Sequence, residues 1–208
     1  LKIKSSFFLV ISILLIFTFC KKAENTEKPI ISLKGTNPLY LGINDNYEEP
    51  GYTANDKEDG DISAKVSSTG MPDTKKEGSY AITYVVQDND GNNVNITRTV
   101  IVKTLSGAQA IYCKTYTVID NCSNAEYIVK ITPYNNDLNY ILFNKFVNDK
   151  NTYIYGKIYS DGTGQKIEIP QQSSGGHTYK GNGSIAGLSL KINYTKNTNN
   201  CNCDFIPQ

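Results

Sequence analysis

The most constraining feature of the sequence is an even spacing of bulky apolar side chains that is interrupted by one turn. Every second residue from Tyr80 to Val86 is large and apolar, and the spacing resumes between Val94 and Val102. A period of two places one row of side chains on a buried face of a β-strand. The stretch 89–93 supplies Gly and Asn, which tolerate the positive φ of a tight turn. The sequence therefore predicts two paired strands joined by a hairpin.

The residues around this hairpin resemble a known family. They comprise 29–35 (Pro-Ile-Ile-Ser-Leu-Lys-Gly), the Glu-Pro-Gly and Glu-Asp-Gly-Asp-Ile elements within 47–62, the strand 78–88 and the Asp-Gly-Asn turn at 90–92. In this order they resemble the bacterial immunoglobulin-like (Ig-like) domain of pesticidal crystal proteins and bacterial surface proteins. The resemblance implies a seven-strand β-sandwich over 29–104. It also implies a spacer or adhesion role without catalytic residues.

The first twenty residues have the character of an export signal. A short basic region precedes an apolar run from Phe7 to Phe19, and Cys20 follows directly. The run is shorter than the roughly 20 residues of a membrane span and has the proportions of a secretory signal. We therefore predict a signal peptide at 1–19.

Cys20, followed by two lysines, resembles the junction of a bacterial lipoprotein. The resemblance implies that Cys20 is acylated, that 20–28 is a flexible tether, and that the lipid anchors the protein to a membrane. The expected location is the bacterial cell envelope, at the outer membrane or cell surface. Phe17 and Phe19 depart from the Leu and the small residue usual at such a junction. An uncleaved signal anchor and a secreted protein with an incidental Cys20 are the alternatives.

A second β-rich unit is predicted over 111–206. Short alternating runs recur there at spacings of roughly 10 to 15 residues, with polar turns and no helical period. They predict an antiparallel sandwich or a small barrel, and hence an all-β protein. A strand at Ile167 and Ile169 is expected to stop at Pro170, and the run from Tyr179 to Leu190 is similar to the closing hairpin of small lipocalin-like barrels of bacterial lipoproteins.

The remaining cysteines, Cys113, Cys122, Cys201 and Cys203, are predicted to form disulfides, because export leads to an oxidising compartment. A bridge between Cys201 and Cys203 would be strained, because both lie on one strand. We therefore favour bridges between the first and last strands of this unit, with Cys122 joined to Cys201 and Cys113 to Cys203. A zinc site built from the same thiols is the alternative, although the spacing does not fit the usual motifs.

Four acidic residues of the first unit are candidate calcium ligands, because hard cations prefer oxygen ligands: Asp56, Glu58, Asp59 and Asp61. A solvated acidic loop is the alternative. Apart from calcium and a covalent lipid on Cys20, we expect no cofactor.

No catalytic residues are predicted. His177 is the single histidine, and it lies in a loop rich in Ser and Gly, so a Ser-His-Asp arrangement would depend on a mobile base. We therefore do not expect an enzyme.

Charge excludes one class of partner. Without 1–19 the chain has 19 basic and 20 acidic side chains, so no basic surplus is available for nucleic acid.

We expect a non-enzymatic surface or envelope module for binding or adhesion, with carbohydrate or protein as the ligand and the Ig-like domain as a spacer. The alternative is a lipocalin-like carrier of a small apolar ligand. Inward-facing Tyr153, Tyr155 and Tyr159 around a cavity would favour the carrier, and outward-facing rows on a filled unit would favour adhesion.

Overall fold

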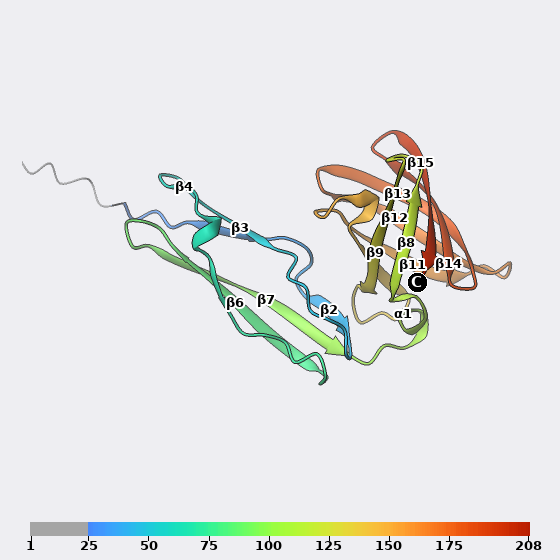
Figure 1. The fold of residues 1–208 in the computed structure, drawn as a ribbon, viewed down its shortest axis with the longest axis horizontal. Coiled ribbons are helices and arrows are strands. Elements are labelled where there is room, and N and C mark those ends of the chain that lie inside the picture. Colours follow the sequence, from blue (N-terminus) through green and yellow to red (C-terminus); the bar gives the residue numbers. More distant parts are fainter. Residues whose placement is uncertain (1–24) are drawn as a thin grey trace, which may run out of the picture.

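Figure 1 shows a computed structural model of the protein, in which two β-rich units are joined by a short connection. The structure describes residues 25–208, so the predicted signal peptide and Cys20 lie outside the described residues. The all-β fold is confirmed. Within the described part, helix is limited to α1 (Gly107–Tyr112) and two single turns, η1 (Ser63–Lys65) and η2 (Phe146–Asn148).

The N-terminal unit is a sandwich of two sheets. Its seven strands are β1 (Ile30–Leu33), β2 (Leu39–Gly42), β3 (Tyr52–Asp56), β4 (Gly60–Asp61), β5 (Ser67–Thr69), β6 (Gly78–Gln87) and β7 (Asn93–Lys103). One sheet has the order β1-β3-β4 and the other β2-β7-β6-β5, with β2 parallel to β7. Ile82, Tyr84 and Val86 of β6 are buried with Val100 and Val102 of β7, so the predicted hairpin and its apolar rows are confirmed.

A buried arginine, Arg98 on β7, interrupts the apolar row. Its side chain has no exposed surface. Nη1 donates to the Thr36 carbonyl oxygen at 2.7 Å, and Nη2 donates to the Lys34 carbonyl oxygen at 2.7 Å and to Glu49 Oε1 at 3.1 Å. The guanidinium therefore fixes the segments on both sides of β2 against β7.

Removing this guanidinium should destabilise the sandwich. Arg98→Ala removes the positive charge beside the Glu49 carboxylate and the donor of the Lys34 and Thr36 carbonyl oxygens, and we expect a loss of about 3 kcal/mol in the free energy of unfolding. Urea unfolding of the full chain measures it. Lys57→Ala is the control, because the Lys57–Glu27 pair is exposed to solvent and its loss should change the stability far less than the loss of the buried Arg98. Equal effects of the two substitutions would contradict the prediction.

Glu49 should make the sandwich sensitive to acid. Burial works to raise the pKa of its carboxyl, but hydrogen bonds from Tyr47, Tyr84 and the Gly51 N–H, with the charge of Arg98, lower that pKa below its ordinary value of 4.5. A group whose pKa is lower in the folded state than in the unfolded state stabilises the fold when it is ionised. Its full contribution to the free energy of unfolding is present above the unfolded pKa, and it is lost as pH falls through the folded pKa. Unfolding measured from about pH 6 to about pH 3 should therefore show a shallower loss of stability in Glu49→Gln than in the wild type. Parallel curves would refute this.

The C-terminal unit is a closed barrel of eight antiparallel strands. They are β8 (Thr115–Asp120), β9 (Ala125–Pro133), β10 (Tyr140–Asn144), β11 (Tyr153–Ser160), β12 (Gln165–Ser174), β13 (His177–Ala186), β14 (Ser189–Lys196) and β15 (Asn199–Pro207). Each strand pairs with the next in sequence, and β15 pairs with β8 to close the barrel. Of the two predicted architectures, the structure has the barrel.

Side chains fill the barrel interior. On β11, Ile154 and Ile158 point inward, whereas Tyr153, Tyr155 and Tyr159 lie on the outer surface. Outward tyrosines on a filled unit are the arrangement expected of a surface module, whereas a carrier would have them around an internal cavity. The buried side chains include Tyr116, Val118, Val129, Ile131, Ile141, Phe143, Phe146, Ile167, Ile169, Tyr179, Leu190, Ile192, Tyr194 and Phe205.

Pro170 does not end its strand, which corrects one expectation. β12 continues to Ser174, and its register against β13 shifts between Ile169 and Gln172. A bulge tolerates proline because the residue there needs no ladder hydrogen bond. The strand therefore passes Pro170 by breaking its pairing locally.

One of the two preferred disulfides is present. Cys122 is joined to Cys201, with their Cα atoms 5.4 Å apart. The expected bridge between Cys113 and Cys203 is not formed, and both are free thiols. Register explains the difference: Cys203 lies opposite Asp120, so Cys113 is out of step with Cys203 by seven positions, about 24 Å along the strands.

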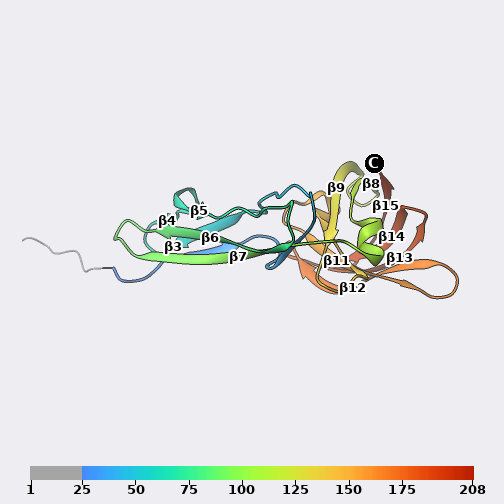
Figure 2. The same cartoon turned by 90° about the horizontal axis from the view of Figure 1, so that it is seen from below.

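Figure 2 shows that the protein is elongated, with the two units following one another along its length. The described chain begins at the end of the sandwich that is remote from the barrel. The sandwich thus separates residue 25 from the barrel (Figures 1 and 2).

Candidate functional site

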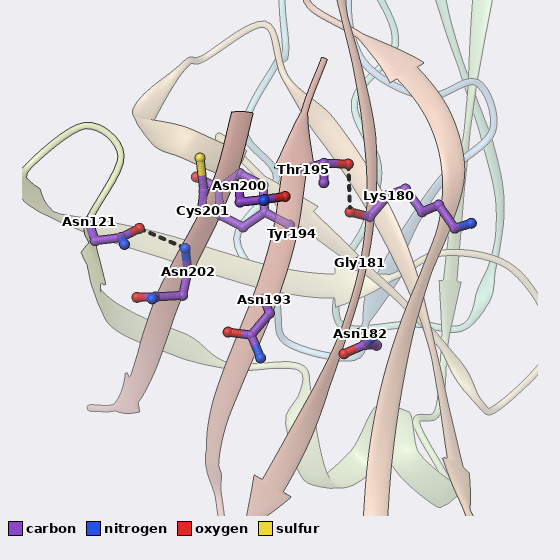
Figure 3. A pocket seen from close by; sticks show the side chains of 10 residues that line it. All are labelled: Asn121, Lys180, Gly181, Asn182, Asn193, Tyr194, Thr195, Asn200, Cys201 and Asn202. Atoms are coloured by element: carbon purple, nitrogen blue, oxygen red, sulfur yellow. Dashed lines mark hydrogen bonds between the residues drawn. The ribbon is translucent and has the colours of Figure 1, made fainter. Parts of the chain in front are cut away.

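Four asparagines cross the outer surface of the barrel, and we call them the amide row. Asn182 of β13 lies opposite Asn193 of β14, which lies opposite Asn202 of β15. The Asn202 backbone N–H donates to Oδ1 of Asn121, which follows β8, at 2.6 Å. All four residues are exposed, and Figure 3 shows them along neighbouring strands. With strands about 4.8 Å apart, the row is roughly 14 Å long.

A hollow of about 440 Å³ lies along the amide row. Lys180, Thr195 and Asn200 complete its polar lining, and Thr195 Oγ1 donates to the Lys180 carbonyl oxygen at 3.3 Å. Figure 3 shows that these residues come from the same three strands, β13, β14 and β15. The hollow is therefore a feature of the outer sheet surface, separate from the filled interior.

Three amides of the row are open to a ligand. Within the described residues, the side chains of Asn182, Asn193 and Asn202 form no hydrogen bond. Each carboxamide offers two N–H donors and an oxygen that accepts two hydrogen bonds. A row of such groups can bind hydroxyls both as donors and as acceptors, and it carries no charge.

Two glycines of β13 set the spacing of the row. A Cβ on Gly181 would lie 2.4 Å from the Asn193 carbonyl oxygen, and a Cβ on Gly183 would lie 2.2 Å from the Lys191 carbonyl oxygen. A side chain at either position would push β13 away from β14. Both positions therefore require glycine for the close backbone approach.

A second feature of the outer surface is a group of three tyrosines, the tyrosine cluster. The rings of Tyr134 and Tyr155 stack with centroids 4.4 Å apart, and the ring of Tyr140 lies 6.1 Å from that of Tyr155. Lys157 Nζ is 5.9 Å from the Tyr140 ring centroid. Lys157 lies opposite Tyr140, and the register continues through Glu168 to the amide row. One line of facing residues thus connects the cluster with the row.

Sequence reasoning did not find these two features. It predicted that Tyr153, Tyr155 and Tyr159 share one face of a strand, but left open whether that face points outward, and it did not show which residues lie side by side. The signal in the sequence is the parity of each asparagine, which places it opposite the buried row of its own strand.

The candidate calcium ligands serve the turn between β3 and β4. Asp56 is buried, and its Oδ1 accepts the backbone N–H groups of Glu58 at 2.9 Å and Asp59 at 3.0 Å. Asp61 Oδ1 accepts both the N–H and the hydroxyl of Ser63. Among residues 25–208, no group of three or more His, Cys, Asp or Glu side chains is arranged to hold a metal ion. Calcium binding at this loop stays a prediction.

His177 begins β13 at one mouth of the barrel. A hollow of about 370 Å³ there is also lined by Asp120, Tyr194 and Lys196. The His177 Nδ1 atom lies 3.0 Å from Nδ2 of Asn197, and the Asp120 carboxylate accepts the Tyr194 hydroxyl at 3.0 Å. The hydrogen-bond partner of His177 is thus an amide rather than an acid.

Of the two free thiols, Cys203 is buried and Cys113 is partly buried, and the pKa of each is raised. Burial raises the pKa of the Cys203 thiol, and the nearby Asp120 carboxylate raises it further. Burial likewise raises the pKa of Cys113, with a smaller contribution from Asp45. Thiols with raised pKa values stay protonated at neutral pH and react slowly.

Comparison with known protein families identifies the N-terminal unit. Residues 31–102 match the family described as "Bacterial surface protein, Ig-like domain". This unit is therefore similar to the Ig-like domains of bacterial surface proteins. The match ends before the barrel and covers the sandwich strands β1 to β7 almost completely. No curated protein matches the chain.

Solved structures give distant likenesses. A lipoprotein from Bacteroides thetaiotaomicron aligns with 86% of this chain and 100% of its own, at 18% identity and a TM-score of 0.45. A carbohydrate-binding module with INT domains from Clostridium perfringens ZmpB, solved in complex with GlcNAc, aligns over 86% of this chain and 43% of its own, at 16% identity and a TM-score of 0.32. The catalytic domain of the same protein with two carbohydrate-binding modules aligns with 86% of this chain and 21% of its own, at 16% identity and a TM-score of 0.33.

None of the helices in the described residues has the length and apolar character needed to cross a membrane.

Proposed function

We propose that the chain is an exported lipoprotein, held in the bacterial envelope by a lipid on Cys20, and that its barrel binds uncharged carbohydrate along the amide row. The Ig-like domain acts as the spacer. The observation that carries this proposal is the set of three exposed carboxamides, on adjacent strands, whose side chains are not engaged within the described structure. Sugars present hydroxyls at similar short intervals, and amides bind hydroxyls without a charge.

The filled interior supports an external site. A carrier of apolar ligands needs a cavity lined by apolar side chains, and the positions that would line it are packed against one another. The tyrosine cluster adds an apolar face along the line of the row, where the C–H groups of a sugar ring can pack against an aromatic ring. Exposed hydrogen-bonding groups and aromatic faces together suit a polar ring ligand.

The arrangement of the units supports the spacer role. The sandwich lies between residue 25 and the barrel, so a lipid before the tether would leave the barrel farthest from the membrane (Figure 2). The described residues of the predicted tether, 25–28, are polar, as expected of a tether.

Binding should depend on the amide row. The full chain is tested on a glycan array, and the best glycan is then titrated by calorimetry. We expect Asn193→Ala with Asn202→Ala to weaken binding about tenfold or more, since each lost hydrogen bond contributes about 1 kcal/mol. Asn95→Ala is the matched control, an exposed asparagine on β7. Unchanged affinity in the double variant, or binding to matrix proteins instead of glycans, would overturn the carbohydrate site.

The anchor is tested separately. Mass spectrometry of the membrane fraction should find Cys20 acylated at the N-terminus of the mature chain, and Cys20→Ala should move the protein out of that fraction. Two or more acyl chains hold a protein stably on a bilayer, whereas none leaves it free. An unmodified Cys20 still preceded by residues 1–19 would count against the lipoprotein.

A further inference from the structure

A cleft of about 530 Å³ separates the Ig-like domain from the barrel. One wall is formed by β2 and the segment 46–50, and the other by β8, β9, β10 and the turn that follows β10. Ligand pockets of roughly 300–1,000 Å³ occur preferentially at such domain junctions. The cleft is distinct from the amide row, with which it shares no residue.

Direct contacts fix the two walls against each other. Lys130 Nζ of β9 lies 3.4 Å from Asp45 Oδ1, and Lys103 Nζ donates to the Asn135 carbonyl oxygen at 3.3 Å. The Tyr153 ring approaches Gly35 so closely that a Cβ there would lie 3.4 Å from its Cζ. These contacts cross between the units at three places. The cleft is therefore part of a defined interface.

The charge available in the cleft is positive. Lys145 and Lys150 line it, and their side-chain ammonium groups form no hydrogen bond or ion pair within the described residues. The carboxylate of Glu49, on the opposite wall, is already held by Arg98. Of the two carboxylates that line the cleft, Glu48 is then the one without a cationic partner among the described residues. Two lysine ammonium groups face this single carboxylate, so the balance of unpaired charge is positive. An anionic group entering the cleft meets two ammonium groups.

The turn that carries these lysines has a strained backbone. Lys145, Val147 and Asn148 have φ values of 62°, 56° and 58°, in the left-handed region. For a β-branched residue such as Val147 this conformation is a rare outlier. It is held by the Phe146 side chain, which is buried in the barrel core, and by the Phe146 N–H, which donates to the Thr152 carbonyl oxygen at 3.0 Å. Strain of this kind is concentrated at binding and catalytic sites, because it fixes a geometry in advance.

The cleft also has an apolar component. Ile128, on β9, is 59% exposed although it lies on a strand that lines the cleft, and the Tyr153 ring lies nearby on the same wall. An inorganic anion would leave these surfaces uncovered. A ring that carries a carboxylate would cover them and pair its charge with the lysines.

We propose that this cleft binds an acidic saccharide, through its carboxylate at Lys145 and Lys150 and its ring against Ile128 and Tyr153. The saccharide class rests on the proposed function, but the site does not. The cleft thus selects its sugar by charge, whereas the amide row has no ionised group of its own and selects by hydrogen bonds.

Calorimetry with the full chain tests the proposal, using digalacturonate, its uncharged counterpart galactobiose, and inorganic phosphate as probes. We expect digalacturonate to bind and to weaken at least tenfold in the variant Lys145→Asn with Lys150→Gln. Asparagine tolerates the left-handed backbone at position 145, so this variant should keep its fold. Lys166→Gln with Lys191→Gln removes two charges from barrel positions that do not line the cleft, and it should bind like the wild type.

Three outcomes would overturn the acidic-saccharide site: no binding of digalacturonate, unchanged binding in the cleft variant, or equal binding of galactobiose or phosphate. The amide-row variant Asn193→Ala with Asn202→Ala separates the two proposals. Its binding of digalacturonate should match the wild type, and if it is lost while the cleft variant binds normally, the acidic sugar occupies the amide row instead.

Discussion

The pairing of β15 with β8 is the constraint on which the C-terminal unit depends. It places Phe205 opposite Val118 and turns an open sheet into a closed barrel. Closure removes both exposed edges, and eight strands enclose a space that side chains just fill. Phe146, which comes from a turn rather than a strand, contacts Tyr194 and Phe205 inside. The filled interior therefore leaves the outer surface and the junction with the N-terminal sandwich as the places where the proposed ligands can bind.

The sequence predicted which residues of one strand share a face, but it did not predict which residues of different strands lie side by side. The alternation predicted the hairpin of β6 and β7 and the shared face of Tyr153, Tyr155 and Tyr159 on β11, because a period of two is a property of a single chain segment; which way that face points was settled only by the closed barrel. The amide row depends on register: Asn121 and Asn202 are 81 residues apart in sequence and meet only because the barrel closes. The same constraint governs the cysteines. Residues that face each other across one antiparallel pair have a constant sum of residue numbers, so a register that joins Cys122 to Cys201 excludes a bridge between Cys113 and Cys203.

Arg98 is a charged residue at a position where the strand pattern calls for an apolar one, and its contacts explain why. Its position belongs to an apolar row, and a charged side chain there would normally be excluded from the core. The guanidinium is tolerated because the Lys34 and Thr36 carbonyls and Glu49 accept hydrogen bonds from its two terminal nitrogens, while its buried Nε has no partner among the described residues. Such a buried pair adds little net stability over an apolar replacement, but it fixes the chain to which it is bonded. The chain fixed here includes Glu49, which lines the cleft, so the arginine defines one wall of the interdomain site.

The two candidate sites differ in chemistry and lie along the same strand. Thr115 at the start of β8 lines the cleft, and Asn121, just after its end, belongs to the amide row. Six residues of extended chain separate the sites by about 20 Å, which is longer than the amide row itself. A saccharide of one or two rings cannot touch both. Each site must therefore recognise its ligand with its own groups, amides in one case and lysines in the other, and a polymer that engaged both would have to extend along β8.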